Sequence, residues 1–112
     1  MKETIGKINK FRDERDWRQF HNEKDLAISI SIEASELLEL FQWKTSEVTV
    51  SEKLPQIKEE LADVFIYAFM LADNLNLDVE KIIDDKIVVN SKKYPIKKSF
   101  GTNKKYTEFK GE

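Results

Sequence analysis

Residues 26–41 read LAISISIEASELLELF, and this stretch decides how the chain folds. Its apolar side chains recur with the period of an amphipathic helix and form one stripe, made of Leu26, Ile30, Leu37, Leu40 and Phe41. Glu33 falls in the middle of this stripe, and Glu36 lies on its edge. A bare carboxylate buried there would cost several kcal/mol, so it must be protonated, paired or bound to a cation. The stretch therefore predicts a packed helix that carries a functional acidic pair.

A second acidic pair, Glu60 and Asp63, repeats the spacing of Glu33 and Glu36 on another predicted helix. Residues three apart share one helix face, so each pair presents both carboxylates together. Two such pairs facing each other would form an all-oxygen cage for hard divalent ions. Carboxylate ligands favour Mg²⁺ or Mn²⁺ over zinc or copper, and the single histidine does not supply the two Glu-x-x-His motifs of a di-iron bundle. The alternative is an ordinary solvated acidic face.

The acidic pairs also indicate a type of chemistry. A carboxylate-bound Mg²⁺ usually keeps several waters and completes its shell with phosphate oxygens of a substrate. Two such ions can activate a water and neutralise charge on a leaving group. The chain has no glycine-rich phosphate loop, so phosphates would be held by metal and side chains. We therefore expect phosphoryl or nucleotidyl chemistry.

The composition is that of a single helix-rich domain. The chain has 112 residues, with three glycines, two prolines and no convincing strand pattern, which predicts an all-α fold. The net charge of −2 gives no general reason to bind nucleic acid or an anionic membrane. The absence of cysteine excludes thiolate metal sites and fits a reducing cytoplasm. No signal peptide is evident, and the longest apolar run, Val64–Ala72, is far below the ~18–20 residues of a membrane span, so we expect a cytoplasmic protein.

Four helices are predicted from capping residues and apolar periodicity. They cover residues 2–14, 26–43, 52–76 and 79–93. The predicted N-caps of the last three are Asp25, Ser51 and Asp78. Pro55 falls in the first turn of its helix, where the missing N–H costs little. Thr45–Val50 is expected to be a loop, and the chain from Ile96 onward is expected to be extended or mobile.

The third predicted helix is apolar on more than one side. Its main stripe includes Leu61 and Phe65, while Ile66, Phe69 and Met70 make the opposite face apolar as well. A helix that is apolar all round is buried all round, and three other helices cannot cover it. We therefore expect a partner chain on this helix, most simply in a two-fold dimer.

Three side chains are candidates for recognising a nucleotide base. Trp17 and His21 lie in the predicted loop 15–24, and Trp43 ends the second helix. Aromatic rings can stack on a base in a sequence-tolerant way. Packing in the core is the alternative; it is preferred for Phe20 and stays open for Trp17 and Trp43. His21 alone would be an ordinary structural or surface residue.

Three further residues are candidate substrate contacts. Tyr67 follows Asp63 by one turn and shares its face, so it is either a hydrogen-bond donor behind the acidic pair or a core residue. Lys86 and Asn90 lie four residues apart on one face of the fourth helix. Such a row is usually solvated, but beside a triphosphate it could contact phosphate oxygens.

Taken in order, these motifs resemble the all-α MazG-like nucleotide pyrophosphohydrolase superfamily, and more closely its dCTP pyrophosphatase branch. The similar segments run from Glu14 to His21, from Glu36 to Lys44, from Glu59 to Tyr67, from Lys86 to Pro95 and from Gly101 to Glu108. The similarity extends over roughly residues 8–109, which is nearly the whole chain.

The resemblance implies a four-helix bundle over residues 1–95, followed by a basic polar tail at 96–112, in a homodimer or homotetramer. It implies hydrolysis of a nucleoside triphosphate, dCTP or a modified or non-canonical relative, to the monophosphate and pyrophosphate with Mg²⁺, for which Mn²⁺ can substitute. The implied catalytic and metal-binding residues are Glu33, Glu36, Glu60 and Asp63. The implied substrate-binding residues are Trp17, His21, Trp43, Tyr67, Lys86 and Asn90. The implied role is the cleansing of cellular nucleotide pools.

Two positions depart from the pattern of the branch. Glu23 stands where proline is frequent, and Ile8 stands where relatives can carry a polar residue. Both would lie near the base, so the preferred base and sugar stay open. The alternative function is a non-enzymatic helical interaction or regulatory module, which would bind no Mg²⁺.

Overall fold

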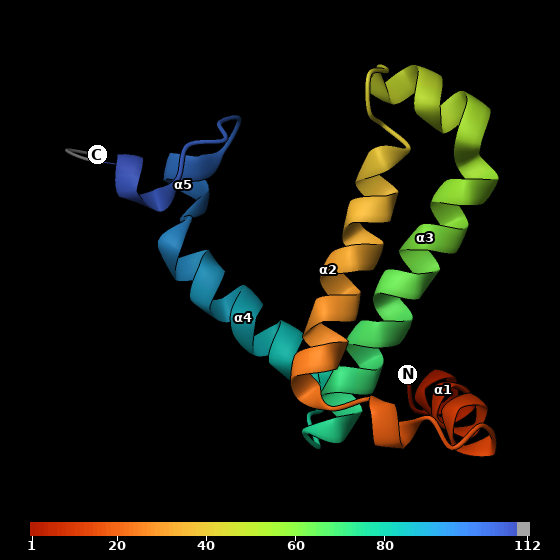
Figure 1. Cartoon of the computed structure of the whole chain (residues 1–112). Helices are drawn as coiled ribbons and strands as arrows, with labels where there is room; N and C mark the ends of the chain where they lie inside the picture. Colours follow the sequence, from red (N-terminus) through yellow and green to blue (C-terminus); the bar gives the residue numbers. More distant parts are fainter. Residues whose placement is uncertain (110–112) are drawn as a thin grey trace. The chain divides into compact units, whose positions relative to one another are not determined.

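Helices account for all the regular secondary structure in the described part of the chain. The computed structural model describes residues 1–109. Its elements in chain order are α1 (Lys2–Glu14), η1 (Arg18–Phe20), α2 (Glu23–Glu39), α3 (Ser46–Asn74), α4 (Val79–Lys93), α5 (Ile96–Ser99) and η2 (Tyr106–Glu108). No strand occurs among residues 1–109, which confirms the all-α prediction. None of these helices is long and apolar enough to cross a membrane. The chain forms two compact units, Met1–Leu77 and the residues from Asp78 onward (Figure 1).

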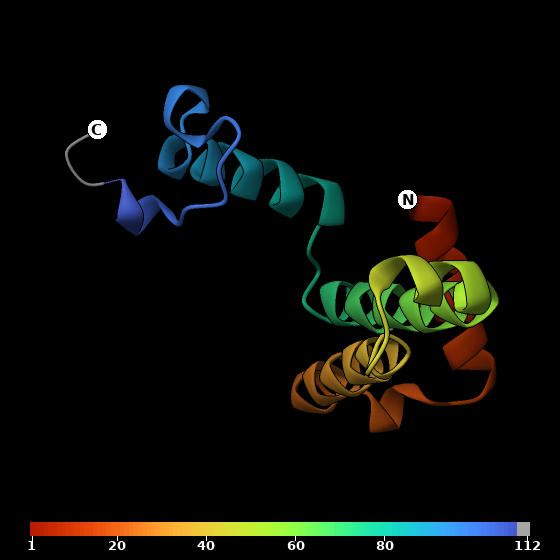
Figure 2. The same ribbon diagram turned by 90° about the horizontal axis from the view of Figure 1, so that it is seen from above.

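In the first unit, α2 and α3 lie side by side and run in opposite directions, and α1 packs against α3 (Figure 1 and Figure 2). The core contains Leu26 from α2 together with Met70 and Ala72 from α3, each no more than 7% exposed. Leu26 belongs to the apolar stripe that the sequence predicts. The stripe of α2 therefore faces α3, and this places Glu33 and Glu36 at the junction of the two helices.

Helix α2 begins and ends earlier than predicted. Its N-cap is Asn22, whose side chain accepts a hydrogen bond from the backbone N–H of Asp25. Asparagine caps as well as aspartate, and the predicted cap Asp25 instead lies in the first turn of the helix, where an acidic side chain favours the helix dipole. The helix ends at Glu39, and the residues up to Trp43 form turns rather than the predicted last helical turn.

Helix α3 begins at Ser46, so the loop predicted at Thr45–Val50 is wrong. Thr45 caps the helix by accepting a hydrogen bond from the N–H of Val48 at 3.2 Å. The backbone then departs from helical geometry at Lys53, two residues before Pro55. Proline lacks an N–H and its ring clashes with the carbonyl four residues earlier, which kinks a helix. The helix predicted to start after Ser51 therefore matches only the segment of α3 beyond this kink.

The exposed apolar face of α3 also differs from the prediction. Met70, which was assigned to the side facing a partner, is 3% exposed. Leu61 and Phe65, which were assigned to the buried stripe, are 41% and 52% exposed. Met70 is buried because α1 packs on the side of α3 that carries it, whereas Phe69, assigned to the same side, is half-buried and stacks on the exposed Phe65. The uncovered apolar surface of α3 therefore lies around Leu61 and Phe65.

The second unit confirms one predicted helix and corrects the predicted tail. Asp78 caps α4 by accepting a hydrogen bond from the N–H of Lys81 at 3.1 Å, as predicted. Beyond α4 the chain forms α5 and η2 instead of an extended tail. The ring of Tyr94 meets those of Tyr106 and Phe109 edge to face, with centroids 6.0 Å apart in both pairs. These contacts fold residues 96–109 back on the end of α4; the last three residues of the predicted tail lie outside the described part.

Candidate active site

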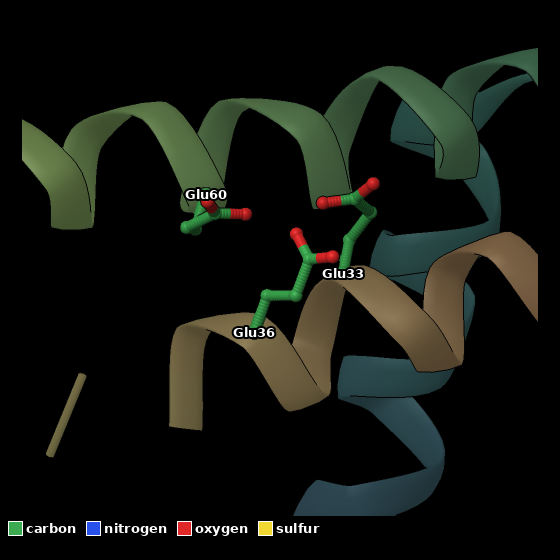
Figure 3. Close-up of side chains that lie close together, drawn as sticks. All are labelled: Glu33, Glu36 and Glu60. Atoms are coloured by element: carbon green, nitrogen blue, oxygen red, sulfur yellow. The ribbon is translucent and has the colours of Figure 1, made fainter. Parts of the chain in front are cut away.

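Three of the four predicted acidic ligands meet between α2 and α3. Glu33 and Glu36 project from α2 towards Glu60 on α3 (Figure 3). One carboxylate oxygen from each residue lies within 4.8 Å of the others. The antiparallel packing of the two helices produces this meeting, because it brings the acidic position in each apolar stripe to the same level. We call Glu33, Glu36 and Glu60 the carboxylate cluster.

The carboxylate cluster is crowded, and two of its oxygens are buried. The Oε2 atoms of Glu33 and Glu60 are buried and have no hydrogen-bond partner among the described residues. Burial, and then the neighbouring Glu36, raise the pKa of Glu33 from its ordinary 4.5 to about 7. Burial and Glu36 raise the pKa of Glu60 as well. Crowded, desolvated oxygens of this kind fit a hard divalent cation, which would satisfy both orphaned atoms and offset the repulsion.

Asp63, the fourth predicted ligand, lies one turn beyond Glu60 and opens onto a neighbouring cavity. This cavity has a volume of about 410 Å³ and lies between α1, the loop that follows it, and α3. Its lining residues are Lys7, Ile8, Phe11, Trp17, His21, Asp63, Ile66, Tyr67 and Met70. Four of the ten predicted site residues therefore line one cavity, and Asp63 connects that cavity with the carboxylate cluster through its i,i+3 neighbour Glu60.

One wall of the cavity is a chain of aromatic rings. Phe11 meets Trp17 edge to face with centroids 5.5 Å apart, and Trp17 meets His21 in the same way at 6.3 Å. His21 in turn meets Tyr67 at 6.5 Å. Edge-to-face contact is a favoured geometry for aromatic pairs, so each ring helps to orient the next. The wall offers flat apolar surface, with polar atoms at His21 and Tyr67.

The polar groups of this wall are held in their neutral forms. Burial, and then the charges of Arg12 and Arg18, lower the pKa of His21. Burial, and then the carboxylates of Glu33 and Asp63, raise the pKa of Tyr67. A neutral imidazole offers one donor and one acceptor, and an un-ionised phenol can donate its O–H. The Nδ1 atom of His21 is buried without a hydrogen-bond partner among residues 1–109.

Three predicted site residues belong neither to this cavity nor to the carboxylate cluster. Trp43 is 93% exposed in the turns after α2, and its φ of 66° is unusual for a bulky residue. Lys86 and Asn90 lie on α4, four residues apart on one face, and both are exposed. The cavity of the first unit is built without them. Sequence reasoning also missed Lys7, for which no signal exists, and Phe11, whose helical spacing indicates only a core position.

The family of the chain follows from its match to known proteins. Residues 28–109 match the MazG-like family, and the chain belongs to this family. The resemblance inferred from the ordered motifs is thereby confirmed. The chain is 37% identical to dCTP pyrophosphatase 1 of Homo sapiens over 116 residues and 36% identical to that of Mus musculus over 112 residues. Each of these matches covers 95% of this chain and 66% of the relative, so the chain spans about two thirds of their length.

A solved structure shows the same fold. A pyrophosphatase from Archaeoglobus fulgidus is 38% identical, with a TM-score of 0.81. The match covers 85% of this chain and 92% of that one.

Proposed function

We propose that the chain is a nucleoside triphosphate pyrophosphohydrolase, which cleaves between the α and β phosphates to give a monophosphate and pyrophosphate. The observation that carries this proposal is that Asp63 lies between the carboxylate cluster and the cavity with the aromatic wall. The carboxylate cluster suits phosphates held through a metal ion, and the cavity suits a base. Membership of the MazG-like family and the similarity to dCTP pyrophosphatase 1 support the same reaction.

The metal in this proposal is Mg²⁺, with Mn²⁺ as a substitute. Glu33, Glu36, Glu60 and Asp63 would hold it, and their all-oxygen donor set suits these two ions. A bound ion of this type polarises a phosphate and lowers the pKa of a coordinated water. Among the chain's own groups, a carboxylate oxygen that the metal does not use would accept a hydrogen bond from the attacking water and take its proton.

The substrate base would occupy the cavity against the aromatic wall. A volume of about 410 Å³ falls within the usual range for small-molecule sites, about 300–1,000 Å³. Trp17 would stack on or beside the base, while neutral His21 would donate to and accept from its edge. Tyr67 would donate its O–H near the phosphates. The substrate we propose is dCTP or a modified or non-canonical relative.

The three predicted substrate contacts outside the cavity are explained in this proposal by an oligomer of the chain. Trp43, Lys86 and Asn90 would contact the nucleotide within a homodimer or homotetramer. Support comes from an apolar cavity of about 470 Å³ between α1 and α3, which includes Phe65 and Phe69. Phe65 stacks on Phe69 at 6.1 Å and is still 52% exposed. Apolar surface of this kind marks an interaction site.

Light scattering tests the assembly. Phe65→Glu would put a charge into the contact, and we expect it to dissociate the assembly and to reduce activity together. Lys24→Glu, a charge change at an exposed position in the first turn of α2, is the matched control. A stable, fully active wild-type monomer of 13.2 kDa would contradict the proposal.

The reaction itself is tested with a panel of nucleoside triphosphates in Mg²⁺. We expect pyrophosphate release, loss of activity in excess chelator, and recovery with Mn²⁺. The proposed role of the enzyme is to cleanse cytoplasmic nucleotide pools. Modified and non-canonical triphosphates are therefore included in the panel. Orthophosphate as the primary product, or full activity in chelator, would exclude the proposed reaction.

A further inference from the structure

An ion-pair network lies behind the aromatic wall of the cavity. Arg12 on α1 is fully buried, and its Nη2 atom donates to Oδ2 of Asp73 on α3 at 3.0 Å. Arg18 in the following loop donates to the same oxygen at 3.3 Å and also pairs with Asp13. One carboxylate oxygen therefore receives two guanidinium groups from different elements. We call these four residues the Arg–Asp clamp.

The loop joined by the clamp begins with a Schellman motif at the end of α1. The N–H of Trp17 donates to the carbonyl of Arg12 at 2.9 Å, and the N–H of Asp16 donates to that of Asp13 at 3.1 Å. Asp16 has the left-handed φ of 53° that this motif requires, where glycine is usual. The Trp17 ring contacts Phe11, which is the apolar contact that commonly accompanies the motif. The direction in which Trp17 leaves α1 is thus set locally.

The far end of the loop is tied to the last turn of α3. The side chain of Asn74 donates to the backbone carbonyl of His21 at 2.6 Å. Asp73 and Asn74 are consecutive, so two neighbouring side chains of α3 hold the loop, one through Arg18 and one through His21. The two cavity residues Trp17 and His21 stand on either side of Arg18. These contacts between the loop and α3 therefore help to set the positions of the cavity side chains Trp17 and His21.

Stability alone does not account for the clamp. A buried ion pair is often no more stabilising than apolar side chains of the same volume. Arg12 also leaves its Nη1 atom buried without a hydrogen-bond partner among the described residues. Charge-assisted hydrogen bonds are directional, because a guanidinium group holds a carboxylate in a fixed geometry. The clamp can therefore fix the orientation of the groups that it joins.

We propose that Arg12, Arg18 and Asp73 are positioning residues, which fix the loop carrying Trp17 and His21 against α3 and so set the shape of the base pocket. This proposal rests on the proposed function, because that function makes the cavity a base pocket. None of the three residues needs to touch the nucleotide. The loop that the clamp holds carries Trp17 and His21 and no member of the carboxylate cluster, so we expect the clamp to act mainly on the base.

The first test reads the position of Trp17 without any nucleotide. A Trp43→Phe background leaves Trp17 as the single tryptophan, because the chain has two. Asp73→Asn keeps the volume of the side chain but removes its charge. Trp17 is 40% exposed, and release of the loop should raise its quenching by acrylamide by about twofold. Unchanged quenching would overturn the proposal, whatever the chain binds.

The second test uses nucleotide affinity and turnover. Asp73→Asn should raise KM and the Kd of a non-hydrolysable triphosphate about tenfold, because a small misplacement of a binding group is costly. Turnover at saturating substrate and inhibition by inorganic pyrophosphate should stay within about twofold of wild type. In a protein that already carries Trp17→Ala, Asp73→Asn should weaken nucleotide affinity by less than about a further threefold, because both substitutions act through the Trp17 ring. Additive losses, or equal losses for pyrophosphate, would contradict the positioning role.

Two further variants complete the design. Arg18→Gln removes one arm of the clamp at an exposed position, so it serves if Asp73→Asn does not fold, with the same expected direction. Asp85→Asn is the matched control, since it breaks an exposed ion pair with Lys81 on α4 and should change neither readout. A wild-type protein that binds no triphosphate would refute the proposed function, while the quenching experiment would still decide whether the clamp holds the loop.

Discussion

Helix α3 carries two charged groupings that differ in the balance of their charges. Near its end, Asp73 receives guanidinium groups from Arg12 and Arg18. Thirteen residues earlier, about 20 Å along a helix, Glu60 faces the carboxylates of Glu33 and Glu36. The first arrangement is complete within one chain, whereas the second becomes favourable only when something positive is added. The difference supports the two proposals, that the first grouping holds the pocket in shape and that the second binds a cation.

Breaking the balanced grouping should have the largest effect on stability. Asp73→Ala leaves the guanidinium of Arg12 buried without its counter-ion, which should cost about 3 kcal/mol of the free energy of unfolding. Urea titration followed by circular dichroism measures this change. A loss below about 1 kcal/mol, as typical of exposed pairs, would place Asp73 with ordinary surface charges.

Removing a charge from the carboxylate cluster should stabilise the metal-free protein and reduce its activity. Glu33→Gln should lower turnover more than about a hundredfold, because it removes a metal ligand. In chelator the same variant should melt at a higher temperature than wild type, because one of three crowded negative charges is gone. Initial rates and thermal melts on the same samples test both parts. Near-wild-type turnover with Mg²⁺ would remove Glu33 from the metal site.

Trp43 belongs to neither charged grouping, so its substitution tests nucleotide binding apart from both of them. Trp43→Ala should weaken nucleotide binding by about one power of ten, within the ~1–3 kcal/mol of base stacking. Because its side chain is 93% exposed, the change should leave the melting temperature of the chain nearly unaltered. Calorimetric titration with nucleotide and with bare pyrophosphate separates base from phosphate effects. Equal losses for both ligands would argue against stacking.

The smallest expected effect is a pH dependence of the metal-free protein. The pKa of Glu33 is raised to about 7 in the folded chain, from an ordinary 4.5. Stability from the protonated form is therefore fully present below pH 4.5 and is lost as the pH rises through about 7. In chelator, the melting temperature should fall by several degrees across this window, and Mg²⁺ should reverse the fall at its upper end. Glu33→Gln should flatten the slope and leave the part that comes from the raised pKa of Glu60.

The comparison also explains what the sequence could predict. Helices α1 and α4 were located correctly because their signals are local, such as the cap at Asp78. Glu33 and Glu60 were recognisable because each sits where an apolar stripe should continue. Arg12 and Asp73 were not, since they lie 61 residues apart and each looks like a surface charge until α1 is packed on α3.

The errors in the prediction also have physical causes. The start of α3 was missed because β-branched residues around Thr49 weaken the helical signal, while a threonine cap restores it. Leu61, Phe65 and Met70 were misplaced on α3 because periodicity shows that two sides are apolar but not which one α1 covers. The tail was taken as extended because its charged residues conceal Tyr106 and Phe109, whose ring contacts with Tyr94 fold it back.

The carboxylate cluster finally sets an order of events. A free triphosphate carries several negative charges, and the carboxylate cluster adds further acidic groups at the site proposed for the metal. Like charges at close range repel strongly where water is partly excluded. Under the proposed function, the cation would therefore arrive before the nucleotide or together with it, and a nucleotide that comes alone would be repelled. Encounter rates should thus follow the concentration of the metal–nucleotide complex rather than that of the nucleotide.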